Sequence, residues 1–341
     1  MRAIDLRSDT VTKPSPEMRR AMADAEVGDD VLDRDPTTAR LEARVAELLG
    51  MGDALFFPSG TQANQTAVAL LTRPGTELLL EANAHLVHYE FAGVAANWGV
   101  QIRTIATPDG ALTGDLVRAA LRPASPHVPH AAAVAAENTH NAAGGKVMAV
   151  EVMAGIAAAA RDAGLPLHLD GARLWNAAAA LGVPASRLAA GATTVMVSFS
   201  KGLGCPVGSC LGVPAGERGR AWEIRKRLGG GMRQSGILAA AALWALDHNV
   251  ARLAEDHANA RLLAERLAAC PAVRTEPPQS NVVMVDLVRE GATAEAAVAT
   301  LAQAGVLVVP FGPRRLRAVT HLDIARHDVE RAADAIARTL A

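Results

Sequence analysis

The sequence predicts an α/β protein with a mostly parallel sheet, helices on both faces of that sheet, and a smaller α+β unit after it. Short apolar runs alternate with helical stretches through the first two thirds of the chain, as in successive βαβ units. Polar residues directly follow several of these runs. In parallel sheets, ligands bind beyond the carboxyl ends of the strands.

The first part of the chain shows clear signals for the start and end of a helix. A helix is predicted over residues 36–50, because Thr37 or Thr38 can cap it and Gly50 can end it. Apolar periodicity and turn residues indicate the elements that follow. They are an apolar run at 54–57, a helix at about 62–71, an apolar segment at 77–80 and a strand at 101–105.

The middle of the chain is the most regular part. Asp170 directly follows one predicted strand, and Ser200-Lys201 follows another. The elements predicted here are a strand at 131–136, a helix at 150–163, a strand at 165–169, a helix at 174–181 and a strand at 194–199. This alternation places successive strand ends at one edge of a sheet.

The chain length indicates two domains, because 341 residues exceed what one hydrophobic core usually serves. A long helical stretch over 235–270, broken near Asn249, joins the two parts. We predict a large domain over residues 1–245 and a small C-terminal domain over 246–341. The small domain is expected to contain a strand at 281–287, a helix at 293–304, a strand at 307–309, a segment at 316–320 and a helix at 325–340.

Composition and charge favour some classes of partner over others. The net charge of -1 gives no reason to expect nucleic acid or an anionic membrane, and small substrates are favoured. The charged first ten residues do not resemble a signal peptide, and the longest apolar stretch, near 236–246, is too short to span a bilayer. The three cysteines form no CxxC pair, so neither a disulfide framework nor a zinc site is expected. A cytoplasmic protein without a metal fits these features.

Asp170 and Lys201 form the strongest chemical pair in the sequence. Their spacing matches one βαβ unit of about 30 residues, so both side chains can face one pocket. Pyridoxal 5′-phosphate (PLP) requires these two residue types: an amine for the Schiff base and a carboxylate that keeps the pyridine nitrogen protonated. Alone, each is more often a surface lysine or a helix-capping aspartate. Together with their flanking residues they predict a PLP site.

A second group of residues has the properties of an anion site and a ring partner. The Ser59-Gly60-Thr61 loop lies between a predicted strand and a predicted helix, where free backbone N–H groups bind anions such as phosphate. Ordinary helix capping would use the same residues. His85 follows the next predicted strand and could stack on a ring or act as a general base, although a turn histidine is an equally good reading.

Two arginines are candidates for binding an anionic group. Arg233 lies in a glycine-rich turn, and Arg317 lies in the C-terminal unit. Arginine suits bidentate binding of carboxylate or phosphate, but each could also be a solvated surface charge. Rival motifs fail, since the chain contains no complete GxGxxG, no P-loop and no GxSxG.

Taken together, these segments resemble the L-threonine aldolase family, which comprises fold type I PLP-dependent enzymes of the β-eliminating lyase superfamily. The resemblance covers nearly the whole chain, and many matches in order are far more specific than any single one. The matching segments are 6–12, 27–31, 57–61, 137–141, 168–173, 200–203, 229–234 and 317–321.

The resemblance implies an aspartate aminotransferase-like, three-layer PLP-binding domain over residues 1–245. Lys201 would form the Schiff base, Asp170 would pair with the pyridine nitrogen, and Arg173 would contact the ring hydroxyl. His85 would stack on the ring. The residues implied to bind the cofactor are Ser59, Gly60, Thr61, His85, Asp170, Arg173, Lys201 and Arg233, the last of them from the same or from a neighbouring subunit.

The resemblance also implies the substrate groups and the reaction. Ser8, Arg173 and Arg317 would hold the carboxylate of an L-β-hydroxy-α-amino acid, which is cleaved to glycine and an aldehyde. His85, His127 or a bound water would be the base at the hydroxyl. PLP-dependent β-elimination, or transfer of the glycyl unit to another aldehyde, is the alternative, and a homotetramer with sites at subunit interfaces is implied.

One segment departs from the family. Leu32 and Asp33 stand where the family usually has Tyr and Gly after Gly-Asp-Asp-Val. The only tyrosine of the chain is Tyr89, shortly after His85. The departure concerns the substrate range, because this segment lies near the site in the family.

Overall fold

A computed structural model describes residues 3–340; Met1, Arg2 and Ala341, at the ends of the two predicted domains, lie outside the described residues. Its larger part is built on a seven-stranded sheet of order β2-β8-β7-β6-β5-β3-β4. The pairs of neighbours from β7 to β4 are parallel, and β8 runs antiparallel to both of its neighbours. The strands are β2 (Asp53–Phe57), β3 (Glu77–Glu81), β4 (Gln101–Ile105), β5 (Ala131–Glu137), β6 (Leu167–Gly171), β7 (Thr194–Ser198) and β8 (Ser209–Val213).

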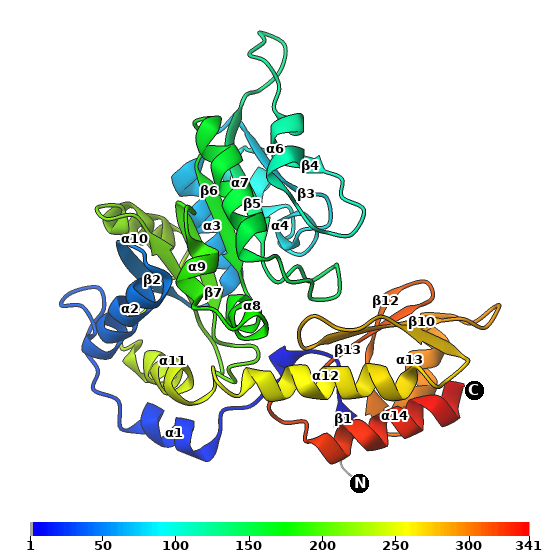
Figure 1. Ribbon diagram of the computed structural model, residues 1–341. Helices are drawn as coiled ribbons and strands as arrows, with labels where there is room; N and C mark the ends of the chain where they lie inside the picture. Colours follow the sequence, from blue (N-terminus) through cyan, green and yellow to red (C-terminus); the bar gives the residue numbers. More distant parts are fainter. Residues whose placement is uncertain (1–2, 341) are drawn as a thin grey trace.

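Helices cover both faces of this sheet, which gives three layers (Figure 1). Alternation along β2 shows why: Ala54 and Phe56 point into one buried cluster, and Leu55 and Phe57 into another on the opposite face. The first face carries α2 (Pro36–Leu49), α6 (Gly114–Ala120), α7 (Val150–Asp162), α8 (Leu174–Leu181) and α9 (Ala185–Ala189). The second carries α3 (Gly60–Leu71), α5 (Gly93–Trp98) and α10 (Arg218–Arg227).

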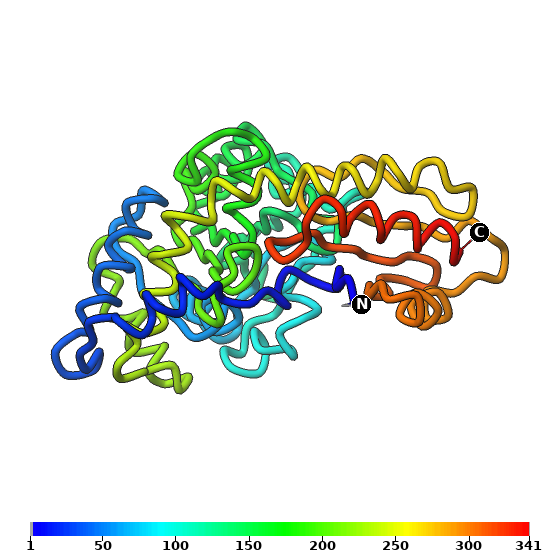
Figure 2. The backbone as a smooth tube through the Cα atoms, turned by 90° about the horizontal axis from the view of Figure 1, so that it is seen from below, coloured from blue at the N-terminus to red at the C-terminus, as the bar shows by residue number. Residues whose placement is uncertain are grey.

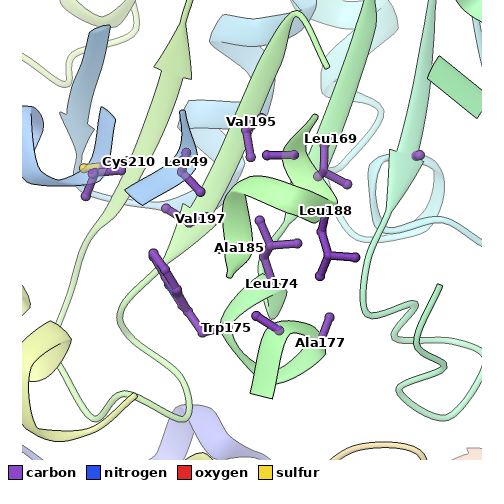
Figure 3. Packing of buried hydrophobic residues seen from close by; sticks show 14 of the residues in the cluster. Leu49, Leu169, Leu174, Trp175, Ala177, Ala185, Leu188, Val195, Val197 and Cys210 are labelled. Atoms are coloured by element: carbon purple, nitrogen blue, oxygen red, sulfur yellow. The ribbon is translucent and has the colours of Figure 1, made fainter. Parts of the chain in front are cut away.

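The packing beneath β6 and β7 is dense. Leu169 and Val195, from the two strands, lie in one cluster with Leu174 of α8 and Leu188 of α9, and all four are fully buried (Figure 3). Close packing of this kind holds the backbone with little freedom. The carboxyl ends of the two strands are therefore rigid supports for whatever they carry.

The smaller part is an antiparallel sheet of order β12-β13-β10-β9 with helices beside it. Its core joins leucine and valine side chains of the sheet to apolar faces of the helices. The elements are α12 (Leu253–Leu267), β9 (Val273–Thr275), β10 (Val282–Leu287), α13 (Ala294–Gln303), β12 (Val309–Gly312), β13 (Arg315–Val319) and α14 (Arg326–Leu340). The helix α11 (Gly236–His248) precedes α12 and packs against α1 (Pro16–Ala23).

The start of the chain packs with the smaller part. The strand β1 (Ile4–Asp5) pairs in parallel with β11 (Val306–Leu307), and Ile4 and Leu6 join the core of the smaller part. Figure 2 shows this blue segment running from beside the orange and red elements toward the opposite end of the molecule. The domain limits 1–245 and 246–341 stay a prediction, since the first residues contact the other part.

The structure also differs from the expected elements in places. The strand expected at 165–169 is β6 (Leu167–Gly171), because the Leu165 N–H still closes the end of α7 by donating to Ala160 O at 2.9 Å. The strand expected at 307–309 is divided between β11 and β12, which belong to different sheets. The antiparallel strand β8 was not expected. No helix among residues 3–340 is long and apolar enough to cross a membrane.

Candidate active site

Three ionisable residues lie together at the carboxyl edge of the large sheet. Glu137 ends β5 and is in register with Asp170 near the end of β6, while Lys201 follows β7. Because β5, β6 and β7 are parallel neighbours, the side chains at these ends meet at one edge. Burial and the nearby Asp170 charge raise the pKa of Glu137. Asp170 and Lys201 therefore lie at the same edge of the sheet, and their joint role at a cofactor stays a prediction.

The Asp170 carboxylate is held from the side facing the helix α3. Its Oδ2 accepts a hydrogen bond from Asn64 Nδ2 at 2.8 Å, and its Oδ1 accepts one from Ala172 N at 3.1 Å. Behind Asn64, His168 Nε2 lies 3.0 Å from the Asn64 amide oxygen. Asp170 is only 1 % exposed, so these contacts leave its carboxylate in a fixed position.

The side-chain amine of Lys201 has no hydrogen-bond or ion-pair partner in the described part of the chain. Its backbone oxygen accepts a hydrogen bond from Thr12 Oγ1 at 2.9 Å, whereas Nζ makes no hydrogen bond or ion pair with any residue in the range 3–340. Burial, and then the charge of Arg173, lower the pKa of this amine against the opposing charges of Asp9 and Asp170. A lysine with a lowered pKa is more often neutral and therefore nucleophilic.

His85 begins α4 (His85–His88) and faces the same edge. Its backbone N–H donates to Glu137 Oε2 at 2.7 Å, and its ring Nδ1 lies 3.1 Å from Glu90 Oε1. Burial disfavours the charged ring, but the hydrogen bond to Glu90 and the charge of Asp170 outweigh it and raise the pKa of His85. The ring also stacks on Tyr89 with centroids 5.4 Å apart.

His85, Glu90 and Asp170 offer ligand atoms within 4.8 Å of one another. The Asn64 amide nitrogen, however, already donates to both carboxylates, at 2.9 Å to Glu90 and 2.8 Å to Asp170. We therefore assign this group to hydrogen bonding, and no metal is inferred from it.

Two guanidinium groups converge on one amide oxygen. Arg173 Nη1 and Arg317 Nη1 lie 3.3 Å and 3.0 Å from Asn141 Oδ1. Arg173 is fixed from the other side by Asp9, whose two oxygens each accept a hydrogen bond at 2.7 Å. Asp9 is fully buried, and although burial opposes ionisation, Arg173 holds the pKa of Asp9 at about 2. Arg173 is consequently neutralised in place.

Arg317 has no such partner. It makes no ion pair with any described carboxylate, and its Nε is buried without a hydrogen-bond partner. Burial, and then the charge of Arg173, lower the pKa of Arg317. Its Nη2 contacts Arg7 O at 3.3 Å, which places Ser8 beside it. A partly buried cation with an unsatisfied donor is suited to binding an anion such as a carboxylate.

The start of α3 supplies the third feature of the site. Ser59 Oγ accepts a hydrogen bond from Gln62 N, and the helix begins at Gly60. A Cβ atom at Gly60 would lie 3.3 Å from Met196 Cε and 3.5 Å from Ser209 Oγ. The Ser209 hydroxyl is buried without a partner. A helix start with close backbone approach and an unpaired hydroxyl fits a phosphate group.

Two of the predicted site residues, His127 and Arg233, do not lie at the carboxyl edge of the large sheet within one chain. His127 lies on the loop between α6 and β5, which Figure 1 shows at the end of the sheet opposite to the one facing α12. Arg233 is exposed and pairs with Asp29 at 3.2 Å. Leu32 is 76 % exposed and follows Asp29 in the same loop. The roles expected for His127 and Arg233 stay predictions.

Four residues of the site were not singled out by the sequence. Asp9, Asn64, Glu90 and Asn141 each fix another side chain by hydrogen bonding. Asp9 and Asn141 lie in segments that had been noted only as matches to the family. Asn64 and Glu90 had no signal beyond a polar residue among apolar ones.

This chain is similar to several known proteins. Residues 5–290 match the model of the beta-eliminating lyase family. A probable low-specificity L-threonine aldolase of Arabidopsis thaliana is 43 % identical, covering 97 % of this chain and 95 % of the relative. The low specificity L-threonine aldolase of Escherichia coli K12 is 41 % identical, covering 96 % of each. A threonine aldolase structure from Leishmania major has a TM-score of 0.83 at 23 % identity, covering 99 % of this chain and 100 % of that one. This likeness supports the expected fold.

Proposed function

The chain belongs to the beta-eliminating lyase family and, within it, to the group of low-specificity L-threonine aldolases, and from this premise we propose its reaction. The enzyme cleaves L-threonine, L-allo-threonine and related L-β-hydroxy-α-amino acids to glycine and an aldehyde. The pair of guanidinium groups at Asn141 carries the proposal, because two cations at one point would bind a carboxylate, and one of them, Arg173, is near enough to act on the charge of the Lys201 amine.

The residues present fit PLP. Lys201 would bind the aldehyde carbon of the cofactor, Asp170 would keep its pyridine nitrogen protonated, and the loop 59–61 would bind its phosphate. The support is the unengaged Lys201 amine, the buried carboxylate of Asp170 and the unpaired Ser209 hydroxyl beside the helix start. When bound, PLP supplies an electron sink for the pair of electrons released from the Cα–Cβ bond.

The two arginines would orient the substrate. Arg317, with its unsatisfied Nε, would bind the α-carboxylate, and Arg173 would stay beside it on Asp9. Ser8, next to the backbone oxygen that Arg317 contacts, would add a hydroxyl donor. Fixing the carboxylate in a bidentate manner restricts rotation of the substrate, so that the bond to be cleaved stays in one orientation.

His85 would exchange the proton at the β-hydroxyl. Its ring faces the edge that carries Asp170 and Lys201, and its side chain is 29 % exposed. A base with a pKa near neutral is suited to this step. Within one chain His85 is better placed than His127, whose loop lies beyond the opposite end of the sheet.

Incubation with L-threonine and PLP tests the proposal directly. We expect glycine and acetaldehyde in equal amounts, and no product from Lys201→Ala. Release of 2-oxobutanoate instead would show PLP-dependent β-elimination, and full activity of Lys201→Ala would refute the role of this lysine. A set of β-hydroxy amino acids with longer side chains then measures the substrate range.

We further propose a cytoplasmic homotetramer. The three cysteines, Cys205, Cys210 and Cys270, are buried and free, which suits a reducing compartment. Exposed Leu32 and exposed Phe91 are apolar surface that an interface between subunits would cover. Sedimentation of the purified protein measures the oligomeric state.

A further inference from the structure

Glu90 is a buried carboxyl group that the proposed mechanism does not use. Its side chain is 0 % exposed. Oε1 lies 2.9 Å from Asn64 Nδ2 and 3.1 Å from His85 Nδ1, and Oε2 lies 2.7 Å from Gln65 Nε2. Nitrogen atoms from α3 and α4 therefore surround both oxygens.

The directions of the hydrogen bonds around Glu90 can be deduced from the partners. Trp98 Nε1 can only donate, and it lies 3.1 Å from Gln65 Oε1. The Gln65 oxygen is thus the acceptor toward Trp98, and its NH₂ group must face Glu90. Asn64 faces two carboxylates with its nitrogen and His168 Nε2 with its oxygen. Both oxygens of Glu90 therefore accept a hydrogen bond from an amide nitrogen, Oε1 from Asn64 and Oε2 from Gln65.

This arrangement favours one position of the hydrogen on the His85 ring. Nδ1 lies 3.1 Å from Oε1 of this carboxyl group, and it would donate to that oxygen if it carries the hydrogen of the neutral ring. The other ring nitrogen, Nε2, makes no hydrogen bond with a residue in the described part of the chain. The neutral ring then has its lone pair on Nε2, which is the atom available to a substrate.

The charges that face His85 come from several elements. Glu90, after α4, and Asp170, on β6, favour the protonated ring, whereas Lys201, after β7, opposes it. Glu137, on β5, contacts the backbone N–H of His85 rather than the ring. Among these groups Glu90 makes the direct contact with the ring.

We propose that Glu90 is a positioning residue, which holds His85 in the Nδ1–H tautomer so that Nε2 takes up the β-hydroxyl proton. Asn64 extends this role, because its amide donates one hydrogen to Glu90 and the other to Asp170. The orientation of the ring and the position of the Asp170 carboxylate are thereby linked through one side chain. The part concerning the substrate rests on the proposed function, whereas the tautomer of His85 does not.

Nitrogen-15 NMR of the PLP-loaded protein, labelled at its ten histidines, measures the tautomer. The signals of His85 are identified by their loss in His85→Asn. We expect a protonated Nδ1 and an unprotonated Nε2 above the pKa of the ring. The opposite tautomer would overturn the proposal, and this measurement needs no variant of Glu90 that folds.

Glu90→Gln tests the consequence. Removing an opposite charge at hydrogen-bond distance should lower the pKa of His85 by about one unit or more, and kcat should fall about 100-fold, with its pH profile shifted in the same direction. Glu90→Asp, which keeps the charge, should restore part of the His85 pKa and part of kcat. Glu47→Gln, at a side chain that is 71 % exposed on α2, is the matched control and should change neither.

The outcomes separate the two proposals. A loss of activity in Glu90→Gln with an unchanged His85 titration would mean that Glu90 only supports the fold, and the positioning role would be refuted. A wild-type protein that releases no aldehyde from any β-hydroxy amino acid would refute the proposed function, whether or not the His85 signals respond to Glu90.

Discussion

Asp9→Asn is the substitution whose effect can be worked out most fully from the structure. Asp9 is fully buried and accepts two hydrogen bonds at 2.7 Å from Arg173. Its pKa of about 2 lies below the ordinary 3.8, which corresponds to about 2 kcal/mol of stability at pH 7. Removing one partner of a buried ion pair typically costs about 3–5 kcal/mol. We therefore expect Asp9→Asn to lower the free energy of unfolding by about 3 kcal/mol.

Asp5→Asn is the matched control. Asp5 also accepts two hydrogen bonds from one guanidinium group, that of Arg7, but the Arg7 side chain is 50 % exposed. Exposed pairs contribute about 1 kcal/mol or less. Urea unfolding at pH 7, followed by tryptophan fluorescence, should give a much lower midpoint for Asp9→Asn than for Asp5→Asn.

The pH dependence of the Asp9 contribution has a definite sign. Because the folded pKa is lowered, the stabilisation is present above the unfolded value of about 3.8 and is lost as the pH falls through about 2. The difference in free energy of unfolding between wild type and Asp9→Asn should thus have its full size at pH 7 and should become smaller below about pH 4. Equal midpoints for the two variants at pH 7 would refute the assignment of the buried pair.

Arg317→Lys should raise KM for threonine by about tenfold or more, with a smaller change in kcat, because lysine cannot bind a carboxylate in a bidentate manner. Steady-state assays measure both constants, and an unchanged KM would exclude Arg317 from substrate binding. His257, whose Nε2 lies 3.3 Å from Asn176 Nδ2, has a pKa lowered by burial to about 4. The folded protein therefore binds this proton poorly, and stability should fall by about 2 kcal/mol between pH 7 and pH 5 through this group. His257→Gln should unfold with a smaller loss over that range, and an equal loss in both proteins would contradict this.

Site residues at the ends of predicted strands could be identified from the sequence. Site residues that are held by contacts distant in the chain could not. Asp170 and Lys201 could be paired because each follows a strand of one βαβ unit. Asp9 could not be paired with Arg173, because the two residues are 164 positions apart and only the closed fold brings them together. Asn64 lies on the buried face of α3, where a polar residue in a helical pattern gives no indication of its partner.

The missed elements have related causes. The strand β8 joins the sheet in the antiparallel direction between β2 and β7, so it breaks the alternation from which the other strands were predicted. The strand β11 is recognised only through its pairing with β1. Local periodicity carries no information on either relation.

The pairing of β1 with β11 has a consequence for synthesis of the protein. Arg7, which contacts Arg317 through its backbone oxygen, precedes it by 310 residues. At about 5–20 residues per second, ribosomes would need roughly 15–60 s to make the intervening chain. During this interval the first residues have neither a strand partner nor a cover for Ile4 and Leu6. The site around Lys201 can therefore be completed only when translation is nearly finished, and a ribosome-bound chain lacking the last strands should be inactive even if its large sheet has formed.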